Sequence, residues 1–243
     1  MRFSLRARRK TGACFAKLKC QNRQVELHIT NGCSRHAPHA AEPQAIRNDK
    51  GANIMKNQSP PPAYVTFVGP MQYPATKNLR NLLSHLVGNG TPEIYLQFSS
   101  TGGALVEGFA LYNFLRSLPV RLSIHNIGSV ESVAIVVFLA ANQRFACPHT
   151  HFLIHGFDWT FGAQQSIVHE RIKEISKSLE ADEERFIDIL KSRTGMKDTE
   201  LSELDFFRKS VIIGAEDAKK YGIVQEVRQA SIPDGSQVWN VDY

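Results

Sequence analysis

Short apolar runs alternate with segments of helical periodicity from Tyr64 onward, and this alternation constrains the fold more than any other feature of the sequence. The apolar runs predict strands over 64–68, 94–98, 120–127, 150–154 and 223–227. The periodic segments predict helices over 76–87, 105–118, 132–141, 164–193 and 215–221. Strands joined by helical crossovers pair in parallel, so the sequence predicts an α/β fold.

The chain of 243 residues divides into a basic N-terminal part and a nearly neutral body. Residues 1–54 carry eleven Lys and Arg against three acids, whereas the remainder carries 18 basic and 20 acidic residues. A nucleic-acid-binding face would be basic on the folded domain itself, so no nucleic-acid partner is predicted. We expect a disordered basic tail and Pro-rich lead over 1–63, one domain over 64–228 and a C-terminal tail over 229–243.

The basic segment has three possible origins. It is Arg-rich and acid-poor, as organelle transit peptides are; it could be a nucleic-acid arm; or it could precede the real translation start at Met55. No stretch approaches the roughly 20 apolar residues of a membrane-spanning helix, so no membrane partner is predicted. Only one of four cysteines, Cys147, lies in the body, and we expect a cytoplasmic protein, or an organellar one if the tail is a transit peptide.

The first segment that could take part in binding or catalysis is Phe-Ser-Ser-Thr-Gly-Gly at 98–103, where a predicted strand meets a predicted helix. Paired glycines at such a corner let backbone N–H groups approach a ligand, so the corner can bind phosphate or stabilise an oxyanion. The pattern matches neither GxGxxG nor GxxxxGK[ST], which disfavours a nucleotide site.

The second segment is Gly-Ser-Val-Glu-Ser-Val-Ala at 128–134, before a wholly apolar helix. Ser132 could be a nucleophile whose oxyanion is held by the N–H of Val133. Alternatively, Ser129 or Ser132 simply caps the helix.

The third segment is His-Thr-His-Phe-Leu-Ile-His-Gly-Phe at 149–157. His149, His151 and His155 share one face of a strand by period 2, which raises the possibility of a zinc site. His155 also lies at the carboxyl end of its strand, where parallel α/β sheets present active-site groups.

These segments together resemble the Clp protease proteolytic subunit, a serine peptidase family with a crotonase-type fold of repeated β-α units. The family's Asn-Ser-Pro-Gly-Gly corresponds to 99–103, its Gly-x-Ala-Ala-Ser-Met to 128–133 and its Met-Ile-His-Gln-Pro to 153–157. Its closing Ser-Ala-x-Glu-Ala-x-x-Tyr-Gly-Leu corresponds to 214–223. The resemblance is collinear over 64–228.

The resemblance implies acyl transfer without a cofactor or metal. Ser132 would attack a peptide carbonyl, His155 would take and return the proton, and the N–H groups of Gly103 and Val133 would hold the oxyanion. The helix over 164–193 would be the family's long handle helix, which joins two rings. Implied partners are peptides or unfolded proteins, further copies of the chain in stacked rings, and a ring ATPase.

The sequence departs from the family at the third member of the triad. The family's Asp falls on Ser210, with Asp205 as an alternative if the loop is rearranged. Glu131, beside the nucleophile, replaces a small residue, and the family's N-terminal axial segment is missing before Tyr64.

Three other functions each fit part of the sequence. A catalytically weak or silent ring subunit follows from Ser210, and a crotonase-like acyl-CoA enzyme would share the fold and the oxyanion corner. A zinc hydrolase would use His149, His151 and His155.

Overall fold

The computed structural model describes residues 61–160, 166–205 and 207–241, together with four short strands between residues 8 and 24. The chain divides into two units, Met1–Met55 and Lys56–Tyr243. In the first unit, β1 (Arg8–Lys10) pairs with β2 (Ala13–Phe15), and β3 (Lys19–Cys20) with β4 (Arg23–Gln24), each antiparallel. Residues 61–63 of the predicted tail and Pro-rich lead are also described, and Ala63 begins β5; the other residues of that segment lie outside the described residues.

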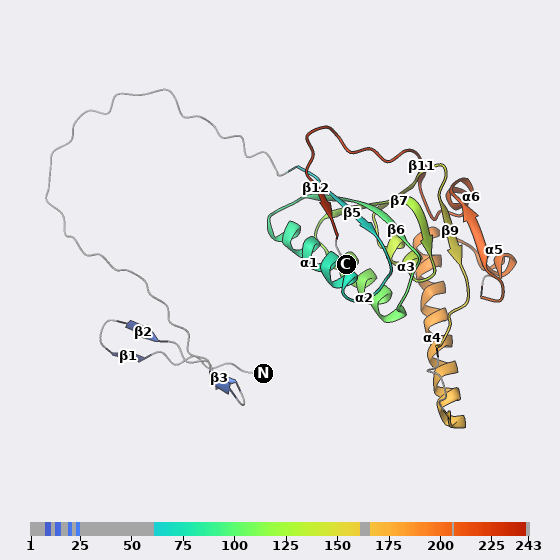
Figure 1. Cartoon of the computed structure of the whole chain (residues 1–243), viewed down its shortest axis with the longest axis horizontal. Coiled ribbons are helices and arrows are strands. Elements are labelled where there is room, and N and C mark those ends of the chain that lie inside the picture. The colour runs from blue at the N-terminus through green and yellow to red at the C-terminus, as the bar shows by residue number, and fades with distance from the viewer. Residues whose placement is uncertain are drawn as a thin grey trace. The chain divides into compact units, whose positions relative to one another are not determined.

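The second unit is an α/β domain, drawn in Figure 1. Its strands are β5 (Ala63–Val68), β6 (Glu93–Ser100), β7 (Arg121–Glu131), β8 (Gln143–Ala146), β9 (His151–Ile154), β10 (Val211–Gly214), β11 (Glu226–Val227) and β12 (Val238–Asn240). Its helices are α1 (Ala75–Gly88), α2 (Leu105–Ser117), α3 (Ala134–Leu139), α4 (His169–Thr194), α5 (Asp198–Leu204) and α6 (Ala215–Lys220).

The eight strands form one sheet in the order β10-β9-β7-β6-β5-β12, and β8 lies against β7 with β11 beside it. Every pairing is parallel except that of β10 with β9. The predicted α/β fold with parallel pairing is confirmed. Residues 229–243, expected to form a C-terminal tail, instead contribute β12, which pairs with β5.

Burial follows the periodicity of each element. Alternate residues of β6 are buried, and α1 buries Leu79, Leu83 and Leu86, which recur on one face at helical spacing. All six residues of α3 are buried, as an all-apolar helix predicts. In Figure 1, α1 and α2 lie side by side against the sheet.

Several boundaries differ from the sequence prediction for identifiable physical reasons. The strand predicted over 120–127 continues to Glu131, because β7 changes partner from β8 to β9 along its length. The helix predicted from 132 begins at Ala134, because Ser132 has a left-handed backbone. In the last predicted strand only Glu226–Val227 pairs, although Ile223 and Val224 are buried.

The long helix is shorter than predicted but still extends well beyond the body in Figure 1. It begins at His169 rather than Gln164, because Val168 is extended (φ −71°, ψ 147°); residues 161–165 lie outside the described residues. Its 26 residues span about 39 Å at 1.5 Å per residue. No helix in the described part of the chain is both long and apolar enough to cross a membrane.

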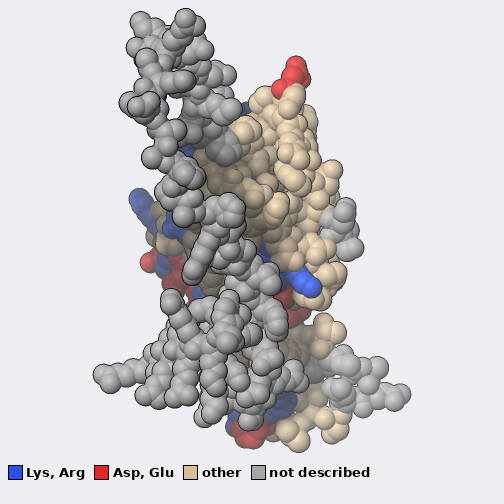
Figure 2. Space-filling model, turned by 90° about the vertical axis from the view of Figure 1, so that its left-hand side faces the viewer, with Lys and Arg blue, Asp and Glu red and all other residues tan. Residues whose placement is uncertain are grey.

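Charges of both signs occupy the surface in Figure 2. On the part of this face that the grey atoms leave visible, Lys and Arg lie among Asp and Glu rather than in one basic patch. This mixture agrees with the nearly neutral charge count of the body.

Candidate active site

Ser132 lies in the sharp turn between β7 and α3. Its φ is +53°, a left-handed conformation that costs a non-glycine residue on the order of 1–3 kcal/mol. Its N–H donates to the carbonyl of Leu153 on β9 (2.8 Å), and its carbonyl accepts from the N–H of Ile135 (3.0 Å). These two hydrogen bonds hold the backbone of Ser132 in its strained conformation. Strain held in place by surrounding contacts is typical of a functional site.

The helix-cap alternative is wrong for both serines. The N-cap of α3 is Val133, and no side chain caps this helix. The Ser129 N–H instead donates to Ser99 Oγ (3.1 Å), whose hydroxyl donates back to the Ser129 carbonyl (3.1 Å). Ser129 therefore ties β7 to β6, and Ser132 is left without a capping role.

The reciprocal bonds of Ser99 lie at a bulge that redirects β7 toward the site. Phe98 pairs with Asn126 and Ser100 with Val130, so one residue of β6 faces three of β7. Asn126 stabilises the bulge by donating its side-chain amide to the carbonyl of His151 (3.0 Å) and accepting the N–H of Gly128 (3.0 Å). The bulge carries the end of β7 to β9, the strand that precedes His155.

Gly102 packs directly against the Ser132 turn. Its φ is +82°, and a Cβ placed there would lie 2.7 Å from the Cβ of Ser132 and 2.8 Å from the carbonyl oxygen of Glu131. Only glycine satisfies both the backbone conformation and the space.

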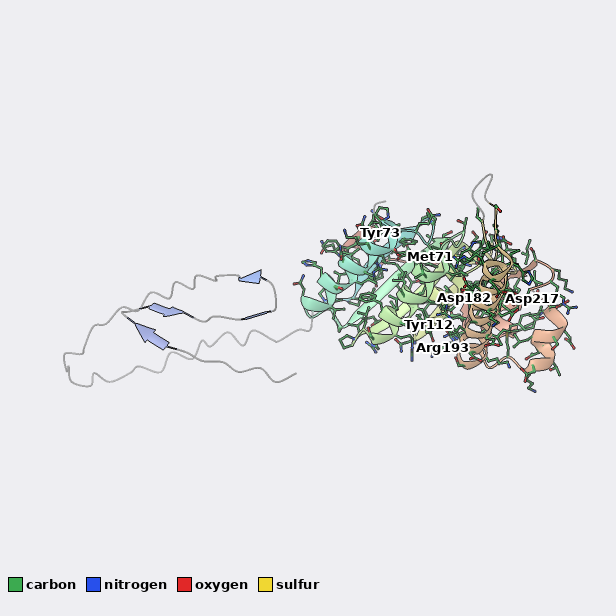
Figure 3. The ribbon with its side chains drawn as sticks, turned by 90° about the horizontal axis from the view of Figure 1, so that it is seen from below. Met71, Tyr73, Tyr112, Asp182, Arg193 and Asp217 are labelled. Atoms are coloured by element: carbon green, nitrogen blue, oxygen red, sulfur yellow. The ribbon has the colours of Figure 1, made fainter. Side chains whose placement is uncertain are left out.

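The backbone N–H groups of Gly103 and Val133 have no acceptor among the residues that the structure describes. Around Gly103, the N–H of Met71 donates to the Gly102 carbonyl (2.7 Å) and the N–H of Ala104 donates to the Met71 carbonyl (2.9 Å); Figure 3 labels Met71. These two hydrogen bonds use the residues on either side of Gly103 and leave its own N–H without an acceptor among the described residues. The N–H of Val133 also donates to no described residue. Two unpaired donors beside a serine can hold an oxyanion.

His155 follows the end of β9 and shares a cleft with Ser132. The cleft has a volume of about 290 Å³ and is lined by Thr101, Gly103, Leu105, Ser132, His155, Phe157, Asp158 and Thr160. His155 Nδ1 lies 2.6 Å from the carbonyl oxygen of Gly156. Among the described residues Ser132 Oγ makes no hydrogen bond to the ring, which is common at catalytic pairs without bound substrate.

The two predicted orienting residues differ in position. Val211 pairs with Ile154 across β10 and β9, so Ser210 and His155 each lie one residue beyond the last pair of this register. Asp205 ends α5, lies 4.0 Å from Arg208 Nε and lines a different cavity from the one that holds His155. Neither side chain hydrogen-bonds the ring within the part of the chain that the structure describes.

The other titratable candidates lie outside this arrangement. Glu131 Oε1 approaches His151 Nε2 at 3.8 Å, so its carboxylate is directed along β9 toward His151. Among the described residues, no three His, Cys, Asp or Glu side chains form a group that could hold a metal ion.

Asp158 is a cleft residue that the sequence did not single out. It is exposed, and it brings a carboxylate to the cleft three positions after His155. In the sequence, only its nearness to His155 pointed to the site, and nearness in sequence does not fix where the side chain of a loop residue lies.

A strained serine and a histidine line this cleft together with Gly103, whose N–H, like that of Val133 beside the serine, has no acceptor among the described residues. A serine hydrolase needs groups of these kinds. The chain belongs to the Clp protease family, which matches residues 63–231. A point mutant of ClpP1 from Listeria monocytogenes has a similar structure, with a TM-score of 0.61 and 22% sequence identity over 69% of this chain and 91% of that chain. The resemblance that the sequence motifs indicated is confirmed, and with it the ClpP-like fold.

Proposed function

We propose that this chain is a serine endopeptidase that cleaves peptides or unfolded proteins. The observation that carries the proposal is the Ser132 turn, because a left-handed serine lies in one cleft with His155 and beside the unpaired N–H groups of Gly103 and Val133. Membership of the Clp protease family supports the same reaction class.

The residues of the cleft act in sequence in the proposed reaction, and His155 serves both as general base and as general acid. His155 Nε2 accepts the proton of Ser132 Oγ as the oxygen attacks the peptide carbonyl, and the N–H groups of Gly103 and Val133 stabilise the oxyanion. The imidazolium then gives its proton to the leaving amine, which leaves an acyl ester on Ser132. The same ring then deprotonates a water molecule, whose oxygen attacks the ester carbonyl. The bond between the acyl carbon and Ser132 Oγ breaks, and the ring returns the proton to Ser132 Oγ.

Labelling of the full-length protein with a fluorophosphonate probe tests this function. We expect labelling of the native chain and of Ser129→Ala, the neighbouring serine on β7, and loss of labelling in Ser132→Ala. Absence of labelling in a folded native protein would contradict the proposal. It would favour the second candidate, a silent ring subunit, which Ser210 in place of the family's Asp supports.

We propose in addition that α4 joins copies of the chain into stacked rings. Its N-terminal end exposes apolar side chains, with Val168 69% and Ile172 52% exposed, and Trp159 (43% exposed) lies near it with Arg171 5.9 Å from its ring centroid. Adjacent exposed apolar side chains are typical of interaction surfaces. A ring ATPase partner and a cytoplasmic location stay predictions.

Sedimentation velocity of the full chain tests the assembly. Ile172→Glu places a charge in the exposed apolar group, so we expect it to reduce the mass of the assembly. Lys220→Glu, an exposed charge change on α6, is the control and should leave the mass unchanged. Native protein that sediments as a monomer would contradict the proposal.

A further inference from the structure

We propose that the backbone carbonyl of Gly156, rather than the side chain of Ser210 or Asp205, orients the His155 imidazole. This inference rests on the proposed function, since it concerns how the general base of that reaction is held. A histidine that serves as base through Nε2 needs its proton on Nδ1 and a fixed ring plane. Any acceptor held near Nδ1 meets both needs, whether or not it carries a charge.

The hydrogen bond at Nδ1 defines the tautomer. A carbonyl oxygen only accepts, so at 2.6 Å from the Gly156 oxygen the Nδ1 atom must carry the proton. In the neutral ring Nε2 is then unprotonated, and it has no hydrogen-bond partner among the described residues. This is the protonation state in which His155 can accept the proton of Ser132.

The Gly156 carbonyl is held by the packing around it. A Cβ on Gly156 would lie 2.7 Å from the carbonyl oxygen of Phe207, so these two backbones are in direct contact. Phe157, Phe186 and Phe207 form a mutual edge-on cluster with ring centroids 5.7, 5.8 and 6.0 Å apart. The cluster joins the loop after β9, the helix α4 and the segment before β10, and so fixes the peptide that carries the acceptor.

The two side-chain alternatives lack this contact. Asp205 lines another cavity near Arg208, as described above. Ser210 lies one residue beyond the last pair of the register, as His155 does, but it is exposed and makes no hydrogen bond to the ring among the described residues. If the carbonyl does the orienting, the Ser210 hydroxyl is dispensable, although the family has an acid at this position.

The ring tautomer can be measured without any assumption about activity. We propose 15N–1H correlation spectra of the histidine rings in the full-length protein, with His155→Gln to assign the His155 signals. The Nδ1–H tautomer is expected in the native protein and, unchanged, in Ser210→Ala. An Nε2–H tautomer in the native protein, or a change of tautomer in Ser210→Ala, would overturn the inference.

The rate of labelling in Ser210→Ala is a second, independent measurement, and because Ser210 is exposed this substitution should leave the fold intact. The rate of fluorophosphonate labelling in Ser210→Ala should stay within about twofold of the native rate, and a loss of tenfold or more would show that the hydroxyl orients the ring. Native protein with the Nδ1–H tautomer but no labelling would refute the proposed function and leave the carbonyl contact standing. Failure of the two proposals is therefore distinguishable.

Discussion

The contact between Gly102 and Ser132 makes a quantitative prediction about the Gly102→Ala variant. The new methyl group would lie 2.7 Å from the Cβ of Ser132, whereas carbon atoms at optimal contact are about 3.5–4.0 Å apart. The serine must therefore move by about 1 Å, and a displacement of that size at a reacting group can cost about 100-fold in rate. We expect Gly102→Ala to slow fluorophosphonate labelling by roughly that factor.

The substitution also affects stability, and the chain offers a control that separates the two effects. Gly102 (φ +82°) and Gly195 (φ +79°) have nearly the same left-handed backbone, but nothing lies within 4 Å of a Cβ at Gly195. Both alanine variants share the cost of a left-handed alanine, about 1–2 kcal/mol. Only Gly102→Ala adds the cost of overpacking, about 1–3 kcal/mol.

The assay compares labelling rates of the two folded variants with that of the native protein, and urea denaturation gives their free energies of unfolding. Gly195→Ala should lose stability but label at the native rate. If Gly102→Ala also labels at the native rate, Ser132 is not the reacting residue or its position does not matter. If both variants slow equally, the loss reflects destabilisation and the displacement argument fails.

Three further predictions concern the body of the domain. Burial lowers the pKa of His125, so between about pH 6.5 and the lowered native pKa the unfolded chain binds a proton that the native state does not. The free energy of unfolding should fall there by up to about 1.4 kcal/mol per pH unit, and urea denaturation at several pH values should show this slope reduced in His125→Gln. Thr76 donates to Glu107 (2.5 Å), the largest cause of the lowered pKa of that carboxyl; Thr76→Val should raise this pKa in an NMR titration and cost about 1 kcal/mol. Buried Arg144 donates to the carbonyls of four residues, so Arg144→Met should cost about 3 kcal/mol in denaturant unfolding, and a cost below 1 would contradict the argument.

Much of the fold was predictable because burial imposes a period on each element. The strand β6 and the helices α1, α2 and α6 lie within a residue or two of their predicted bounds. Elements outside the pattern were missed for specific reasons. The strand β8 contains Arg144, a charge buried among backbone carbonyls, and β12 is short and gains its place only by pairing with β5.

The last turn of α4 shows the same limit on sequence prediction. Periodicity and Gly195 place the end of the helix, since this glycine takes the left-handed conformation that ends helices. Nothing local indicates that Arg193 donates to the carbonyls of Leu139 (2.8 Å) and Ala141 (2.7 Å), which ties α4 to the end of α3. Figure 3 shows Arg193 near Tyr112 of α2; burial and then the charge of Arg116 lower the pKa of Arg193, and Tyr112 raises it. Contacts between distant segments thus fix the helix that a local pattern only delimits.

The site itself follows this division between local and distant information. Local sequence placed Ser132 and His155 at element ends, where functional side chains gather, but left the serine open between a cap and a nucleophile. The difference is its φ of +53°, and this angle depends on Leu153 from β9 and on the space left by Gly102, which lies in the loop after β6. The role of a serine in such a turn is therefore a property of three segments at once, and only the folded chain brings them together.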